Sequence, residues 1–231
     1  MMTAKQDAMI WMNNKFGVDI DAAVAATPIS KKLLIAIGIQ ETFYIWAKMY
    51  KNATAKQVLE LCVGDTIDFP RRATAWPKSR AELEAHPKGA AMFRAARTAL
   101  EKIAAVNSGY KTVLKNPNKF CHGFGMFQYD IQFFRSVDPD YFLNDDWKTW
   151  NGTLSKGITE LKDQMAGLYG AGKASLTHDE SVYLAIAYNQ GAKRTKNNMA
   201  TKKFKQGHKD GNGVFYGEHI DANLKDMKNL F

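Results

Sequence analysis

Glu41 is the residue of this chain whose type and surroundings most directly indicate acid chemistry. It follows an apolar stretch with a helical pattern, residues 33–42, which reads LLIAIGIQET. The residues that share its face at helical spacing are Leu34, Ile37, Gly38, Tyr44 and Ile45. Burial disfavours the charged form of a carboxyl group and raises its pKa, which suits a group that holds a proton near neutral pH and then donates it. The pattern predicts a general acid at position 41, and the alternative is a structural ion pair with a lysine or arginine.

Two further segments place glycine and polar groups where a core pattern predicts apolar side chains. Residues 122–130 read HGFGMFQYD, in which paired glycines allow a close backbone approach and aromatic residues flank Gln128. Residues 187–191 read AYNQG and bring the phenol of Tyr188 and the amide of Asn189 into the last turn of a helix. The first segment could line a sugar groove. Taken one at a time, the two segments also fit a β-turn packed on the core and a polar helix end.

Taken together and in this order, the three segments resemble the lysozyme-like lytic transglycosylases and the goose-type lysozymes. Those chains show Glu-Ser at the end of a helix, then Gly-Leu-Met-Gln, then Ala-Tyr-Asn-x-Gly. The counterparts here are Glu41-Thr42, Gly125-Met126-Phe127-Gln128 and Ala187-Tyr188-Asn189-Gln190-Gly191. Threonine replaces the usual serine, and Met-Phe stands where Leu-Met is usual. The resemblance covers about residues 30–50 and 120–230.

The resemblance implies a glycosidase that degrades peptidoglycan by cleaving the β-1,4 bond between N-acetylmuramic acid and N-acetylglucosamine. Glu41 would be the general acid and base. The implied substrate-binding residues are Gly125, Met126, Gln128, Tyr188 and Asn189. Gln128 and backbone groups near Gly125 and Met126 would bind the sugar, while Tyr188 and Asn189 would hold it or orient Glu41. A transglycosylase uses one carboxylate twice and leaves a 1,6-anhydro end, whereas a hydrolase needs a base that activates water.

Asp130 is the candidate for that second carboxylate, since it lies two residues after Gln128. Asp138, Asp140 and Glu180 are weaker choices, and a predicted capping box already uses Glu180. The five histidines, at positions 86, 122, 178, 208 and 219, do not have the spacing of metal ligands. We therefore expect neither a metal nor another cofactor.

Composition and charge restrict the partners. With 45% apolar and 24% charged residues, the chain is composed like a soluble globular protein, and its net charge of +9 favours polyanions such as nucleic acid, anionic lipid or cell-wall polymers. No phosphate-binding loop, zinc-finger spacing or RNA-binding signature occurs, so we expect peptidoglycan strands and not nucleic acid. The longest apolar run, 33–39, is too short for a membrane span, and the first residues lack the apolar core of a signal peptide. We expect a monomer that acts on the cell wall, either after release or as a phage-encoded protein.

Helical periodicity dominates and predicts a mainly α fold. We expect a single lysozyme-like domain over 1–231, in which residues 52–118 form a helical insertion between the Glu41 helix and the Gly-Phe-Gly-Met-Phe-Gln segment. At most a small β element is expected near 120–130. Ser30 is predicted to cap the Glu41 helix, and Thr177 and Glu180 form a predicted capping box. Cys62 and Cys121 are expected to be buried thiols.

The insertion and the basic segments carry further expectations. Ser79 and Glu82 form a second predicted capping box, and Pro87 is predicted to open a longer helix. The predicted inner face of that longer helix comprises Met92, Ala96, Ala99, Ile103 and Val106. Residues 64–76 are predicted to be a loop. The basic clusters at 193–196 and 202–205 are expected to lie in a solvated loop.

Three other functions stay open at this stage. A non-catalytic glycan-binding or assembly protein of the same fold would explain the long insertion but not the acid at position 41. A chitinase-like hydrolase would share the acid chemistry without recognising the lactyl or peptide groups. A basic nucleic-acid binder fits the charge, and its affinity would fall steeply with added salt.

Overall fold

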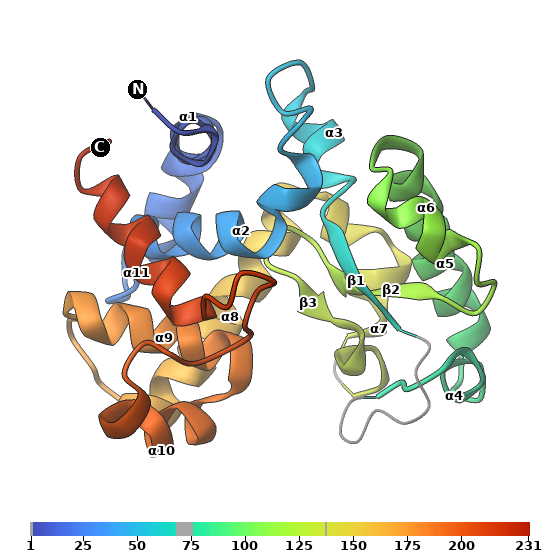
Figure 1. Ribbon diagram of the computed structural model, residues 1–231. Helices are drawn as coiled ribbons and strands as arrows, with labels where there is room; N and C mark the ends of the chain where they lie inside the picture. The colour runs from blue at the N-terminus through green and yellow to red at the C-terminus, as the bar shows by residue number, and fades with distance from the viewer. Residues whose placement is uncertain (1, 68–75, 137) are drawn as a thin grey trace. The chain divides into compact units, whose positions relative to one another are not determined.

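The computed structural model describes residues 2–67, 76–136 and 138–231. The protein is 64% helical, with eleven α-helices among the described residues and one small three-stranded antiparallel sheet (Figure 1). This confirms the predicted mainly α fold with a small β element. The chain divides into two compact units, Met1–Phe43 with Lys156–Phe231, and Tyr44–Ser155. The chain passes between the units within α2 (Lys31–Trp46) and α8 (Trp150–Tyr169).

The first unit is built from helices. Its other helices are α1 (Ala4–Val24), α9 (His178–Gln190), α10 (Ala192–Lys202) and α11 (Tyr216–Met227). Within this unit α9 packs against both α10 and α11, and α1 also contacts α11 (Figure 1). Helix α11 turns Ile220, Leu224 and Met227 inward, and all three are buried. The predicted capping box of Thr177 and Glu180 is present at the start of α9.

Helix α2 begins where the sequence predicts. The hydroxyl oxygen of Ser30 accepts a hydrogen bond from the backbone N–H of Leu33 at 3.2 Å, which satisfies one of the donors exposed at a helix N-terminus. All residues from 33 to 39 are buried. A helix that is apolar on every side must be surrounded by other elements, and α2 therefore provides a rigid support for the residues that follow.

The second unit contains the sheet and the predicted insertion. Its strands are β1 (Val63–Ile67), β2 (Phe120–Phe124) and β3 (Tyr129–Asp130). Its helices are α3 (Ala55–Leu59), α4 (Arg80–Glu84), α5 (Gly89–Val106), α6 (Gly109–Leu114) and α7 (Pro139–Leu143), with 3₁₀ turns η1 (Ile131–Arg135) and η2 (Asp146–Lys148). The central strand β2 pairs with β1 and β3, and α5 packs against it (Figure 1). Cys62 and Cys121 are buried and unbridged, as predicted.

Several details of the second unit differ from the predictions. The stretch predicted to be a loop from 64 to 76 contains most of β1, and 68–75 lie outside the described residues. Helix α5 begins at Gly89, two residues after Pro87, and Val106 at its end is 55% exposed and does not face inward. Only half of the predicted box at Ser79 forms, because the Glu82 carboxylate accepts from the N–H of Lys78 at 2.6 Å.

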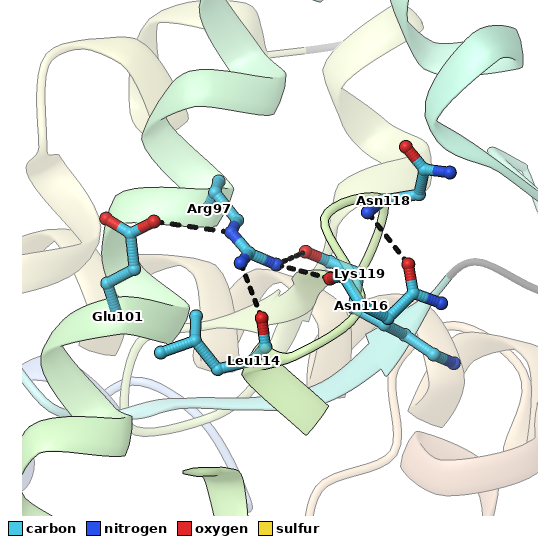
Figure 2. A network of polar contacts seen from close by, with 6 residues as sticks. All are labelled: Arg97, Glu101, Leu114, Asn116, Asn118 and Lys119. Atoms are coloured by element: carbon cyan, nitrogen blue, oxygen red, sulfur yellow. Dashed lines mark hydrogen bonds and ion pairs between the residues drawn. The ribbon is translucent and has the colours of Figure 1, made fainter. Parts of the chain in front are cut away.

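Arg97 on α5 ties together the segment that follows α6. Its Nη1 donates to the carbonyls of Asn116 at 2.7 Å and Lys119 at 2.9 Å, and its Nη2 donates to the carbonyl of Leu114 at 2.7 Å (Figure 2). The guanidinium fork suits several acceptors at once because its donors are fixed in one plane. The contact network therefore holds the C-terminal end of α6 and the turn before β2 against α5.

Candidate functional site

Glu41 lies near the end of the buried stretch of α2 and is itself half-buried. Of the residues predicted to share its face, Leu34, Ile37 and Ile45 are buried, but Tyr44 is 53% exposed. The apolar surroundings predicted for the acid are therefore present on the side toward the preceding turns. The residue is not fully enclosed.

Tyr216 is the partner that fixes the Glu41 carboxylate. It occupies the first position of α11, where only 4% of the residue is exposed, and its hydroxyl donates to Oε1 of Glu41 at 2.7 Å. Burial raises the pKa of Tyr216 well above its ordinary value, and the negative charge of Glu41 and the hydrogen bond to it raise that pKa further. The phenol therefore stays protonated near neutral pH and acts as a donor. It orients the acid and cannot serve as a base.

The end of α9 anchors the loop that presents Tyr216. The side-chain oxygen of Asn189 accepts from the N–H of His208 at 2.9 Å, and that of Gln190 accepts from the N–H of Gly207 at 3.1 Å. The carbonyl of His208 then accepts from the N–H of Tyr216 at 2.7 Å. Asn189 thus supports Tyr216 through the loop backbone, and its predicted contact with a sugar stays a prediction.

Gly207 is required for this close approach. Its φ is 85°, a left-handed conformation that favours glycine, and a Cβ there would lie 2.7 Å from Cβ of Tyr216 and 2.9 Å from Oδ1 of Asn189. Tyr188, the other predicted residue of this motif, is half-buried. A charge on Tyr188 adds to the effects that raise the pKa of Tyr216. The first unit therefore brings Glu41, Tyr216 and the end of α9 into one connected arrangement.

The Gly125–Gln128 segment of the second unit forms a tight turn between β2 and β3. The N–H of Gln128 donates to the carbonyl of Gly125 at 3.0 Å, with φ of 79° at Gly125 and 53° at Gln128. The Gln128 side-chain amide also donates, through Nε2, to Gly125 at 3.0 Å and to the carbonyl of Cys62 at 3.4 Å. Met126 is fully buried. The predicted contact of Met126 with a sugar therefore stays a prediction.

Both oxygens of Asp130 are engaged within the second unit. Oδ1 accepts from the N–H of Gln132 at 2.8 Å and caps η1, while Oδ2 lies 3.1 Å from Nδ1 of His122. The other ring nitrogen of His122 lies 3.6 Å from Oδ2 of Asp65, whose side chain is 78% exposed. Of the weaker candidates, Asp138 caps α7, and Asp140 is exposed in the first turn of α7. The role of Asp130 as a base therefore stays a prediction.

The structure connects some predicted residues and adds others that the sequence reasoning missed. Glu41, Tyr188 and Asn189 belong to the first unit, and Gly125, Met126, Gln128 and Asp130 belong to the second. A single groove formed by both sets stays a prediction. Tyr216 was missed. The only local signal for it is an aromatic residue at the start of a helix, three positions after the Gly-Asn-Gly segment at 211–213.

Within 2–67, 76–136 and 138–231, no group of three or more histidine, cysteine or acidic residues could hold a metal ion. None of the described helices combines the length and apolar character needed to cross a membrane. Comparison with known proteins found no matching family model, no matching curated protein and no matching solved structure.

Proposed function

We propose that the protein is a peptidoglycan-degrading glycosidase in which Glu41 is the general acid. The observation that carries the proposal is the half-buried carboxylate of Glu41 held at 2.7 Å by the buried phenol of Tyr216. A fixed carboxyl group on an apolar helix is what protonation of a glycosidic oxygen requires. The resemblance of three segments to lytic transglycosylases and goose-type lysozymes supports the same reaction. A mere clamp for glycans gains nothing from such an acid.

In the proposed reaction Glu41 donates its proton to the oxygen that bridges N-acetylmuramic acid and N-acetylglucosamine. As that bond breaks, positive charge develops at the anomeric carbon of N-acetylmuramic acid, and Glu41 is left as a carboxylate. Tyr216 continues to donate to Oε1 and so stabilises the charge that forms on Glu41. The carboxylate is then poised to accept a proton in the second step.

The second step distinguishes two outcomes. If Glu41 removes the proton from the 6-hydroxyl of the same sugar, that oxygen attacks the anomeric carbon and a 1,6-anhydro end forms. If a separate base activates water, the product has a reducing end. The engagement of both Asp130 oxygens favours the route that needs one carboxylate only. We therefore expect anhydro ends.

The test compares two glutamate variants on purified peptidoglycan sacculi. Glu41→Gln should lose about 10²–10⁴-fold in the rate of glycan release, the range for removal of a general acid, while its circular dichroism spectrum stays helical. Glu160→Gln is the matched control, because Glu160 is also a half-buried helical glutamate of the first unit and burial raises its pKa. Wild-type rates in Glu41→Gln would remove Glu41 from the mechanism.

Mass spectrometry of the released fragments identifies the reaction. Anhydro ends indicate a transglycosylase and reducing ends a hydrolase. Release from chitin but not from peptidoglycan would indicate a chitinase-like hydrolase. No released product from either polymer, together with retained glycan binding, would replace the proposal with a non-catalytic glycan-binding protein.

A further inference from the structure

A strongly basic surface covers α10 and the segment that follows it. The sequence from 181 to 209 contains no aspartate or glutamate. It contains seven lysines and arginines, which are all exposed and together form the basic surface: Lys193, Arg194, Lys196, Lys202, Lys203, Lys205 and Lys209. Within the described residues, none of the seven forms an ion pair with an acidic side chain.

The charges at the start of α10 act against the helix that carries them. Lys193 and Arg194 lie in its first turn, which contains no acidic residue. The N-terminal end of a helix has a partial positive charge, so cations are unfavourable there. Lys193 and Lys196 are three positions apart on the helix, and like charges at this spacing repel each other. The fold therefore does not explain these charges, whereas a bound polyanion would offset both effects.

Polar contacts nevertheless hold the backbone of this segment in place. The N–H of Ala192 donates to Oε1 of Gln164 on α8 at 2.6 Å, and α10 packs along α9 (Figure 1). After α10, Gln206 is only 3% exposed, and its Nε2 donates to the carbonyl of Lys203 at 2.7 Å. The cations are thus attached to a fixed backbone, which lowers the entropy lost when they bind a ligand.

The basic surface ends at the loop that positions the proposed acid. The carbonyl of His208 accepts from the N–H of Tyr216 at 2.7 Å, and Tyr216 in turn holds Glu41. Lys209, the last cation of the surface, follows directly in the chain, and its Nζ lies 5.3 Å from the centroid of the Phe215 ring. The basic surface and the proposed acid therefore belong to one unit and are linked through this loop.

Other features of the segment distinguish among the polyanions that its charge attracts. Apart from His208, its only aromatic side chain is Phe204, which is half-buried and packs edge-on against Tyr183, so the segment has no row of rings on which nucleic-acid bases stack. Helix α10 buries only Thr195 and has no apolar face that would enter a membrane. Six of the seven cations are lysines, which bind anions as point charges and need no fixed fork geometry. This combination suits carboxylates on flexible peptides.

We propose that the basic surface binds the carboxylates of the peptide stems of peptidoglycan. The identity of the polymer rests on the proposed function, because the N-acetylmuramic acid whose bond Glu41 would cleave carries the stem on its lactyl group. The fixed cations attract this polymer and raise its concentration near the acid. Chitin has no such carboxylates, so the basic surface gives the protein a preference for peptidoglycan over chitin.

The test measures co-sedimentation of the full-length Glu41→Gln protein with sacculi from which phosphodiester polymers have been removed. In this parent, the triple substitution Lys193→Gln, Arg194→Gln and Lys196→Gln should weaken binding about tenfold at about 0.1 M salt, because three exposed charge pairs are lost. At about 1 M salt, where the Debye length is about 3 Å, the difference should fall below about twofold. Urea denaturation should show no loss of stability, since the removed charges oppose the helix.

A second triple variant is the matched control. Arg94→Gln, Lys102→Gln and Lys111→Gln also replace one arginine and two lysines, all of them exposed and in the second unit. Because the net charge falls equally in both variants, a difference in binding reports where the charges lie. The control should bind within about twofold of the parent. Equal weakening by the two variants overturns the basic surface. If the α10 variant does not fold, Lys202→Gln with Lys205→Gln decides in its place.

Modification of the polymer tests the ligand. Coupling of glycinamide to the sacculi with a carbodiimide converts their carboxylates to neutral amides. It should weaken binding of the parent about tenfold and that of the α10 variant much less, because the variant has already lost the cations. Unchanged binding of the parent to amidated sacculi overturns the stem carboxylates as the ligand. Weaker binding of the α10 variant to duplex DNA, with unchanged binding to sacculi, would assign the surface to nucleic acid and also overturn the proposal.

Failure of the basic surface and failure of the proposed function give different results. If wild-type protein releases fragments in a Glu41-dependent manner but binding to sacculi ignores the α10 cations, the enzyme proposal stands and the binding surface is wrong. If the protein releases nothing but its binding to sacculi depends on these cations and on the carboxylates, the binding surface stands and the enzyme proposal is wrong.

Discussion

The two units fix their key polar side chains by contacts of very different range. In the first unit, Glu41 is held by Tyr216, which lies 175 positions away in the sequence. In the second, Gln128 is held mainly by the carbonyl of Gly125, three positions away, within one turn. A contact within a turn forms wherever the local sequence adopts that turn. A contact between distant residues requires that the whole helical core be assembled, so the acid is oriented only in the folded unit.

The second unit also contains contacts between residues that are well separated in the sequence. Those of Arg97 reach carbonyls 17 to 22 positions away. We expect Arg97→Met to lower the free energy of unfolding by about 2–3 kcal/mol, because three backbone carbonyls lose a charged donor. The Arg97 side chain is only 18% exposed, so water replaces these bonds incompletely. Urea denaturation and amide hydrogen exchange over 109–119 measure the effect.

Arg94→Met is the control for this prediction, since Arg94 lies one turn earlier on α5 and is exposed. Its effect should stay within about 0.5 kcal/mol. Equal destabilisation by the two substitutions would mean that the carbonyl contacts contribute nothing measurable. The second unit would then depend on local turns to a greater degree than its contacts indicate.

The long-range contact of the first unit should affect the chemical step. Under the proposed function, Tyr216→Phe should lower kcat about 10–100-fold, with KM changed less than about threefold, because it removes a donor to the acid and no substrate contact. Loss of that donor favours the uncharged form of Glu41, so the alkaline limit of activity should move to higher pH. The activity profile from pH 4 to 9 measures both effects.

Tyr169→Phe provides the matched control, because Tyr169 also donates a phenolic hydrogen bond in the first unit, to the carbonyl of Glu180 at 3.0 Å. It should leave kcat and the pH profile unchanged. A Tyr216→Phe enzyme with normal kcat and a shifted KM would place Tyr216 at the substrate and not at the acid.

The same contrast of range explains which elements the sequence predicts. The start of α2 at Ser30, the box at Thr177 and the buried face of α5 apart from Val106 were predicted correctly, since each depends on residues within a few positions of one another. The turn at Gly125 was also recognised as unusual. Caps and periodic faces are local properties, and one sequence contains all the information they need.

The elements that were missed depend on distant partners. Most of the basic cluster at 202–205 follows the end of α10 at Lys202, as the predicted loop requires. The cluster at 193–196 was also expected to be a loop but lies within α10, where only Thr195 is buried, so that helix has no apolar stripe. Its first residue, Ala192, is held by a 2.6 Å hydrogen bond from its N–H to Oε1 of Gln164 on α8. Tyr216 was missed for the same reason. Its role depends on Glu41 in α2 and on the end of α9, which anchors its loop. No sequence pattern near position 216 indicates either contact.

A substitution that loosens the loop carrying Tyr216 should disturb the contact between Tyr216 and Glu41 less than removal of the Tyr216 hydroxyl does. Asn189→Ala should lower the free energy of unfolding by about 1 kcal/mol, since one backbone N–H, that of His208, loses its acceptor. Under the proposed function kcat should also fall, by less than in Tyr216→Phe, because Tyr216 is displaced but not removed. Asn198→Ala serves as the control, because, among the described residues, the amide of this half-buried residue on α10 bonds only to the carbonyl of Arg194 in the same helix. If Asn189→Ala instead lowers only substrate affinity, the predicted sugar contact accounts for Asn189 better than support of the loop does.

The smallest expected effect is a dependence of stability on alkaline pH that arises from Tyr216 alone. Burial and the Glu41 carboxylate hold the pKa of Tyr216 well above its ordinary value in the folded protein, whereas the unfolded chain loses this proton near pH 10. Above that pH the unfolded state binds fewer protons than the folded state, so the free energy of unfolding falls as pH rises. Between pH 9 and 10.5 the wild type should lose about 0.8 kcal/mol more than Tyr216→Phe.

Urea unfolding of both proteins at the two pH values measures this difference. Burial also raises the pKa of Tyr141 and Tyr169, but both proteins retain those residues, so their contribution cancels in the comparison. Equal losses in the two proteins would show that Tyr216 ionises as readily in the folded state as in the unfolded one. A phenol that ionises so readily would not be buried beside a carboxylate, and the long-range contact that distinguishes the first unit from the second would then be wrong.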